Sequence, residues 1–160
     1  VLRAPRIGEP ERNLEGSVMQ RRNLLAFAMT SMLIHQGAGA AETTKMKIQI
    51  EARGKSWTIL LENNETARAL YSKLPLTLDL EDLYGRELCH RFREALPARE
   101  VEMRGYEVGE VVYWPPRHSF VILYRQNGEA FDMQSIGRVE SGIEALAQLG
   151  DAKVRLTQAE

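Results

Sequence analysis

The sequence predicts a mainly β domain, built as an antiparallel barrel or sandwich, for the part of the chain after residue 40. Two observations predict it. Six or more short segments alternate apolar and polar residues, which is the period of a strand with one face on a core. Only two short segments have helical spacing, which is typical of all-β architectures.

The first predicted elements are a β-hairpin and a helix. Residues 46–51 alternate apolar and polar side chains, and residues 57–61 resume the alternation after a short turn. Asn64 is a predicted N-cap, and apolar residues then recur at helical spacing until Pro75 ends the helix. A strand over residues 76–81 is expected to follow directly.

The middle of the domain combines an irregular segment with strongly apolar strands. Residues 84–104 have no clear period and carry many charges, so we expect a long excursion with one helical turn at most. Residues 109–114 and 119–125 predict two apolar strands. The second of these is apolar on both faces, which indicates a central position with both faces covered.

The last elements are a strand, a helix and a strand. Residues 134–140 predict the first strand. Ser141 and Glu144 are spaced as a capping box and predict a helix that Gly150 ends. Residues 153–157 alternate as the final strand.

Composition limits the function classes. The chain has 160 residues with 21 Lys and Arg against 22 Asp and Glu, so its formal net charge is −1. A near-neutral chain without a long basic run is not expected to bind nucleic acid. The single cysteine, Cys89, excludes an internal disulfide. Because Cys89 and the histidines lack metal-ligand spacing, we expect no metal and no cofactor.

The first forty residues are predicted to lie outside the folded domain. Residues 1–18 have no apolar periodicity and are expected to be a disordered arm or a mis-assigned upstream segment. Residues 19–40 are predicted to be a secretory signal peptide, and residues 41–160 the domain. The predicted location is therefore periplasmic or secreted, without membrane attachment after cleavage.

The signal-peptide prediction rests on three parts in the expected order. Arg21 and Arg22 supply positive charge, residues 24–34 form an apolar run, and small residues at 38–40 predict cleavage after Ala40. The alternative of a membrane anchor is less favoured, because a span needs roughly 20 apolar residues. The arginine pair also loosely resembles a twin-arginine export motif.

Several local strings, taken in order, carry a family resemblance. They are Asn64–Leu70, Leu74–Leu76, Gly109–Pro116 and Ile136–Glu140. Together they resemble the bacterial and archaeal cyclophilin-like domain family over about residues 45–158. The resemblance implies a closed antiparallel β-barrel of about eight strands with two short capping helices. It implies little about activity, because the family is largely uncharacterised.

The resemblance does not carry over a catalytic residue. True cyclophilins are peptidyl-prolyl isomerases that use an arginine, following Phe-His on a strand, beside an aromatic-lined proline pocket. The nearest string here is His90-Arg91-Phe92, which has a different order and lies in the irregular segment. The catalytic residues of any such activity therefore stay unknown.

The richest cluster of candidate binding residues surrounds two prolines between the apolar strands. A rigid turn at the barrel mouth would present Trp114 as an aromatic wall, Arg117 as an anion-binding fork and His118 as a titratable imidazole, with Phe120 beside them. The alternative is a stiff hairpin with Trp114 in the core and the two polar side chains in solvent.

Arg138 is the remaining candidate, because it lies in a predicted strand. An inward-facing arginine needs a carboxylate partner or a bound anion, since an unpaired buried charge is costly. Glu140 and Glu110 are the expected partners. A structural ion pair and a ligand contact both remain open at this stage.

The sequence thus favours an exported domain that binds a small anionic molecule or a short peptide at the barrel mouth. The alternative is a peptidyl-prolyl cis-trans isomerase-like or other small-molecule enzyme, which rests on fold-level analogy and on a possible pair of His118 with an arginine. A third possibility is a subunit of a larger assembly, and the sequence leaves the oligomeric state open.

Overall fold

The computed structural model describes residues 45–160, which form nine β-strands and two short α-helices. In chain order these are β1 (Lys47–Ala52), β2 (Lys55–Leu61), α1 (Glu65–Ser72), β3 (Leu76–Leu83), β4 (Glu87–Arg91), β5 (Glu102–Arg104), β6 (Glu110–Trp114), β7 (Ser119–Leu123), β8 (Phe131–Val139), α2 (Ile143–Ala147) and β9 (Ala152–Ala159). The predicted upstream segment 1–18 and signal peptide 19–40 lie outside the described residues.

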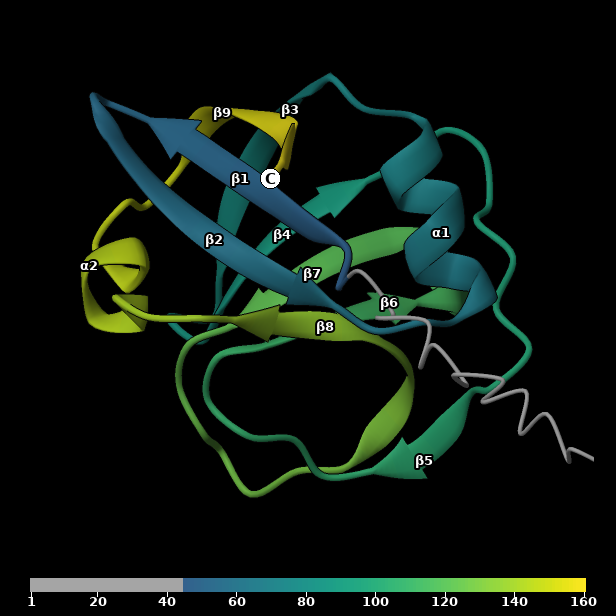
Figure 1. Cartoon of the computed structure of the whole chain (residues 1–160). Coiled ribbons are helices and arrows are strands. Elements are labelled where there is room, and N and C mark those ends of the chain that lie inside the picture. The colour runs from purple at the N-terminus through teal and green to yellow at the C-terminus, as the bar shows by residue number, and fades with distance from the viewer. Residues whose placement is uncertain (1–44) are drawn as a thin grey trace, which may run out of the picture. The chain divides into compact units, whose positions relative to one another are not determined.

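The strands form one antiparallel sheet that closes on itself. Their order is β2-β1-β9-β3-β4-β7-β6-β8, and an additional pairing of β2 with β8 completes the barrel (Figure 1). The short strand β5 adds to β8 outside this ring. The prediction of a closed barrel of about eight strands with two short helices is therefore confirmed.

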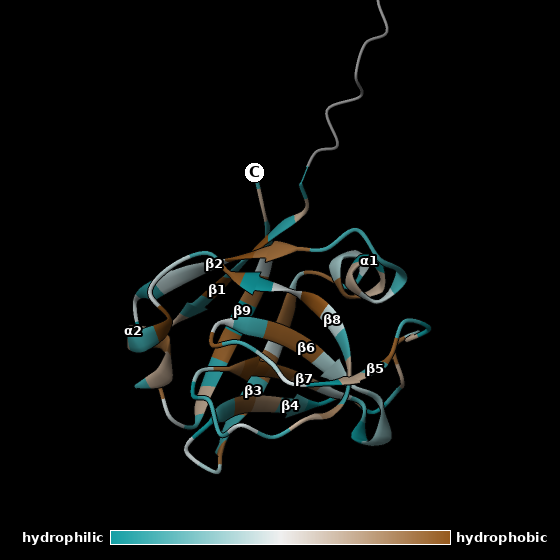
Figure 2. Ribbon diagram, turned by 90° about the horizontal axis from the view of Figure 1, so that it is seen from below, coloured by the Kyte–Doolittle hydropathy of each residue, from teal (hydrophilic) through white to brown (hydrophobic). Residues whose placement is uncertain are grey.

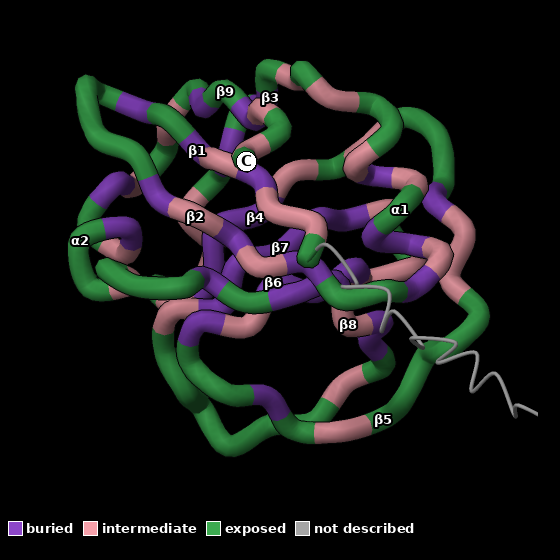
Figure 3. The backbone as a smooth tube through the Cα atoms, viewed as in Figure 1, coloured by how far each residue is buried: buried purple, intermediate pink, exposed green. Residues whose placement is uncertain are grey.

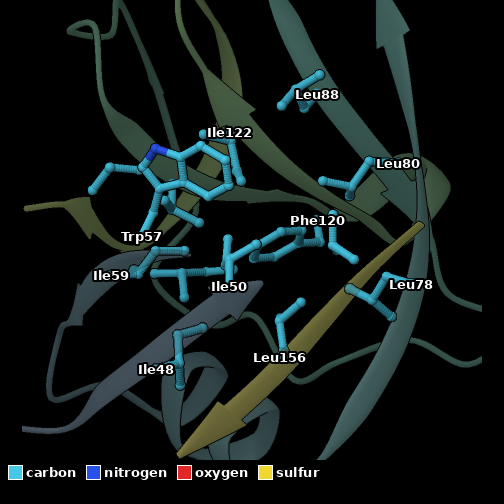
Figure 4. Packing of buried hydrophobic residues seen from close by; sticks show 14 of the residues in the cluster. Ile48, Ile50, Trp57, Ile59, Leu78, Leu80, Leu88, Phe120, Ile122 and Leu156 are labelled. Carbon is cyan, nitrogen blue, oxygen red and sulfur yellow. The ribbon is translucent and has the colours of Figure 1, made fainter. Parts of the chain in front are cut away.

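The barrel interior holds the main hydrophobic core. Side chains from β1, β2, β3, β4, β7 and β9 point toward one another there, among them Ile50, Trp57, Leu88 and Phe120 (Figure 4). Each fully buried side chain of this size contributes about 1.5–3 kcal/mol to folding. A second, smaller cluster lies apart from this core and includes Cys89, Val112 and Val121.

Strand β7 separates the two clusters. Phe120 and Ile122 belong to the interior core, whereas Val121 and Leu123 belong to the smaller cluster, because successive side chains alternate across a strand. All five residues of β7 are buried, and β6 and β7 are apolar along most of their length (Figures 2 and 3). The predicted central strand with both faces covered is confirmed.

Helix α1 begins where the sequence predicts. The side chain of Asn64 accepts the backbone N–H of Ala67 at 2.9 Å and donates to the carbonyl of Ser135 at 2.8 Å. The N-cap therefore also ties the helix to β8. Helices α1 and α2 lie on opposite sides of the barrel (Figures 1 and 2). No helix in residues 45–160 has the length and apolar character that crossing a membrane requires.

The capping-box prediction for α2 is wrong. The N-cap is Gly142, in the left-handed region at φ 75°, and no side chain caps the helix. The carbonyl of Gly142 instead accepts the indole N–H of Trp57 at 3.1 Å, and a Cβ at this glycine would lie 3.3 Å from the same ring. Contact with a residue distant in sequence, rather than Ser141, therefore sets the start of α2.

The prediction of an irregular excursion over residues 84–104 is also wrong in part. This segment contains β4 and β5, and it contains no helical turn. Strand β4 pairs with both β3 and β7. Leu88 packs in the interior while Cys89 packs in the smaller cluster, so the apolar–polar alternation that marks a one-sided strand is absent.

Gly137 allows the barrel to close, which gives a first prediction. It lies opposite Leu61 on β2, and a Cβ there would collide with the carbonyl oxygen of Leu60. We expect Gly137→Ala to lower the free energy of unfolding by about 2 kcal/mol or more, because the backbones must move apart. Urea unfolding followed by circular dichroism measures this.

The matched control for this prediction is Gly105→Ala. A Cβ at Gly105 would meet only the Glu129 carbonyl oxygen, at 4.0 Å, which is ordinary contact. We expect its free energy of unfolding to change by no more than about 0.5 kcal/mol. Equal unfolding midpoints for the two variants would contradict the role assigned to Gly137.

Candidate functional site

A cavity of about 730 Å³ lies against β4, β6 and β7. Its lining comes from these strands, the β3–β4 loop, the turn after β6 and the start of β8. Cys89 and Val121, which line it, alternate with Leu88 and Phe120, which fill the barrel interior. The cavity is therefore on the outer face of the barrel, and not at the barrel mouth where the sequence predicts a binding site.

One end of the cavity is cationic. Arg91, at the end of β4, pairs across the sheet with Ser119 and forms an exposed ion pair with Glu81 at 3.3 Å. Arg117 lies in the single 3₁₀ turn formed by Pro115–Arg117, and it forms no ion pair within residues 45–160. This end therefore presents one uncompensated guanidinium.

Two local hydrogen bonds hold the turn that carries Arg117. The N–H of His118 donates to the carbonyl of Pro115 at 3.1 Å, and the hydroxyl of Ser119 donates to the carbonyl of Arg117 at 3.2 Å. His118 adopts a left-handed conformation at φ 51°, which ends the turn and starts β7. The turn is rigid, as the two prolines predict.

The opposite end of the cavity contains a partly buried ion pair. Arg86 contacts Glu87 at 2.7 Å and Glu129 at 3.3 Å, and its guanidinium lies 5.5 Å from the ring of Tyr84 and 5.7 Å from that of Phe131. Burial alone lowers the pKa of Arg86, but the hydrogen bond and charge of Glu87 outweigh it and raise the pKa above its ordinary value. This arginine is held in place and stays charged.

The floor between the two ends is apolar with one thiol. Cys89 and Val121 face each other across β4 and β7, and Trp114 forms a wall at the end of β6. Burial raises the pKa of the Cys89 thiol, while a hydrogen bond with Ser119 and the charge of Arg91 partly oppose this shift. The thiol is therefore neutral at physiological pH.

The structure brings together two of the five residues that the sequence singles out. Trp114 and Arg117 line the cavity. Phe120 is fully buried inside the barrel, on the other side of the sheet. His118 does not line the cavity, and its carbonyl accepts the backbone N–H of Phe92 at 3.0 Å.

Arg138 lies away from this cavity and points outward. Its side chain is half exposed and contacts Glu107 at 3.2 Å and the carbonyl of Val108 at 3.1 Å. Neither expected partner is used: Glu110 instead pairs with Arg104 at 3.0 Å, and Glu140 forms no ion pair with any residue of the described range 45–160. Of the two alternatives for Arg138, the structure therefore shows an ion pair, with Glu107 rather than Glu110 or Glu140 as the partner.

Sequence reasoning missed most of the cavity lining. Arg86, Glu87, Cys89 and Arg91 all come from the segment that was expected to be irregular, and Phe131 comes from the start of β8. A strand whose two faces are both covered gives no alternation, so its register could not be read. Within residues 45–160 no group of three or more His, Cys, Asp or Glu side chains is placed to hold a metal ion.

The lone thiol gives a second prediction. We expect the alkylation of Cys89 by iodoacetamide to reach half its maximal rate at a higher pH than free cysteine, because burial raises the pKa. Ser119→Ala should move this pH higher still, because the hydrogen bond that the substitution removes stabilises the thiolate. Alkylation rates against pH measure both effects.

The control for this prediction is Ser141→Ala, which removes an exposed hydroxyl outside the cavity. It should leave the pH profile unchanged. A midpoint at or below that of free cysteine in the parent chain would contradict the burial of the thiol.

Comparisons with known proteins agree with this fold. A solution structure of a hypothetical protein from Archaeoglobus fulgidus superposes with a TM-score of 0.59 and 20% identity, over 72% of this chain and 95% of that one. McbB in complex with tryptophan superposes with a TM-score of 0.54 and 19% identity, over 69% of this chain. The match spans 44% of McbB, less than half of its length.

At these identities the two structures show the fold alone. A search of curated proteins finds no significant match. Residues 50–157, more than half of the chain, match the Cyclophilin-like family. The chain therefore belongs to the cyclophilin-like family.

Proposed function

We propose that the domain binds a small organic anion in the outer cavity, with the anionic group at Arg117 and the apolar body against Trp114 and Val121. The observation that carries this proposal is the guanidinium of Arg117, which has no ion pair within residues 45–160 and lines a cavity with an apolar floor. Guanidinium and carboxylate groups form strong, geometrically specific pairs.

The size and lining of the cavity support a small ligand. Small-molecule sites enclose about 300–1,000 Å³ and combine apolar walls with a few polar groups, as this cavity does. McbB, which shares the fold, has been solved with tryptophan, an amino acid that combines a carboxylate with an aromatic body. An indole carboxylate is therefore a suitable first probe for this chain.

The described residues favour binding over catalysis. The enzyme alternative relies on His118 as a titratable group, and neither His90 nor His118 lines the cavity. The ring of His90 instead contacts the carbonyl of Asp79 at 3.0 Å. We therefore propose a binding role and assign no catalytic step.

The binding proposal is tested with two probes that differ only in charge. We expect indole-3-acetate to bind about tenfold more tightly than indole-3-acetamide, because only the former carries a carboxylate for Arg117. Arg117→Gln should remove this difference while leaving the weaker binding of the amide. Calorimetric titration of the full chain measures the affinities, and amide chemical shifts locate the site.

The matched control is Arg155→Gln, which removes an exposed arginine on β9, away from the cavity. It should keep the preference for the carboxylate. Equal affinities of the two probes for the parent chain would refute the proposal. An equal loss of the carboxylate preference in Arg117→Gln and Arg155→Gln would refute it as well.

We also propose that the domain acts outside the cytoplasm, after export and cleavage behind Ala40. The support is the sequence pattern of Arg21, Arg22 and the apolar run that follows. We expect expression of the full chain in a bacterium to give a periplasmic protein whose intact mass is that of residues 41–160. Recovery of uncleaved chain from the cytoplasm alone would refute this proposal.

The export route is read in the same experiment. If the twin-arginine resemblance is functional, replacing both Arg21 and Arg22 by lysine abolishes export. Unchanged export of that variant would assign the chain to the general secretory route instead.

A further inference from the structure

We infer that the ligand of the outer cavity is an elongated zwitterion, with a carboxylate at Arg117 and an ammonium group at Glu87, separated by an apolar middle. This inference rests on the proposed anion site at Arg117 and adds a second charged group to the ligand. It follows from the charge, the spacing and the open hydrogen-bonding capacity of the far end of the cavity.

Among the side chains that line the cavity, those at the far end carry a net negative charge. Arg86 supplies one positive charge there, whereas Glu87 and Glu129 supply two negative ones. At the near end, Glu81 neutralises the charge of Arg91, so the positive charge of Arg117 remains. The cavity is therefore dipolar, and a dipolar ligand complements it in one orientation only.

One carboxylate oxygen of Glu87 has no hydrogen-bond partner in the described part of the chain and is available to a cation. Both contacts from Arg86, through Nε at 3.0 Å and Nη2 at 2.7 Å, reach the same oxygen, Oε2. No hydrogen bond within residues 45–160 reaches Oε1. Within these residues every fully buried side-chain oxygen has a hydrogen-bond partner. Because Oε1 has no partner among them, it is not fully buried. It is thus an open acceptor on a residue that lines the cavity.

The environment makes that oxygen selective for a cationic donor. The side chain of Glu87 is only 11% exposed, so its carboxylate is largely removed from water. A partly desolvated carboxylate with a free acceptor gains most from a charged donor, and an ammonium group is such a donor. An anionic group would be repelled there.

The register of β4 gives the approximate separation between the two ends of the cavity. Glu87, Cys89 and Arg91 share one face of the strand, and Arg91 lies opposite Ser119, next to the turn of Arg117. Four residues of extended strand span about 13 Å between Cα atoms. An α-amino acid, with both charges on one carbon, is too short. A terminal ω-amino carboxylate or a short peptide with free ends has the required separation.

The middle of the cavity requires an apolar linker. Val121 and the thiol of Cys89 form its floor, and the rings of Trp114 and Phe131 stand at its sides. The burial of a methylene contributes about 0.8 kcal/mol. A hydrocarbon linker is therefore favoured over a polar one, and the Cys89 thiol stays neutral beneath it.

The test compares amino carboxylates with plain carboxylates of the same length, by calorimetric titration of the full chain. We expect 8-aminooctanoate to bind about tenfold more tightly than octanoate, because only the former reaches Glu87 with a cation. For the short pair, 4-aminobutanoate and butanoate, we expect no such advantage. Whether a peptide supplies the two charges is tested by comparing the affinity of the tripeptide Ala-Val-Ala with that of its N-acetylated form.

Two variants assign the effect to the acidic end. Glu87→Gln should remove the advantage of the amino group while the affinity for octanoate is kept or increased. Because Glu87 also holds Arg86, the exposed Glu129 gives a second variant: Glu129→Gln should reduce the advantage about threefold. The control Glu107→Gln, on the Arg138 ion pair outside the cavity, should leave it unchanged.

The outcomes separate this inference from the proposed function. Equal affinity of 8-aminooctanoate and octanoate, with indole-3-acetate still bound through Arg117, would overturn the zwitterion and leave the anion site standing. Failure of every carboxylate to bind would overturn both. An advantage seen only with the tripeptide would identify a peptide, rather than an ω-amino acid, as the source of the two charges.

Discussion

The closure of the sheet between β2 and β8 is the constraint on which the rest of the structure depends. Gly137 lets the backbone of β8 come against Leu60 and Leu61, where no side chain fits. Closing the sheet gives every strand an inside and an outside. Because the inside is filled by one continuous apolar core, alternate residues of each strand must face outward. The outer cavity is built from such residues.

The local rules of the sequence predicted the fold well, and the site only in part. Asn64 caps α1 as expected, because a cap depends on its neighbours in the chain. Trp114 and Arg117, which line the cavity, were singled out because Pro115 and Pro116 predict a rigid turn. The start of α2 was missed because the indole of Trp57, 85 residues away, contacts Gly142. Contacts of that kind leave no local pattern.

The sequence failed to predict part of the candidate site for a physical reason that lies in β4. Its first three residues are buried, and Leu88 and Cys89 are both apolar although they point in opposite directions. Pattern reasoning identifies strands by the contrast between their faces, and here that contrast is small. Only the pairing of β4 with β7 shows that Arg91 lies near the turn of Arg117.

In the proposed binding mode, the charged ends of the cavity also determine which ligands it rejects. Arg86 is fixed between two rings and two carboxylates, so it does not swing to neutralise an incoming anion. A dicarboxylate long enough to reach from Arg117 to Glu87 would place a negative charge beside a partly desolvated carboxylate, at a cost that its other end does not offset. A monocarboxylate avoids that cost but leaves the open oxygen of Glu87 without a donor. In the proposed binding mode, discrimination therefore comes from the far end of the cavity, whereas most of the attraction for the anion comes from Arg117.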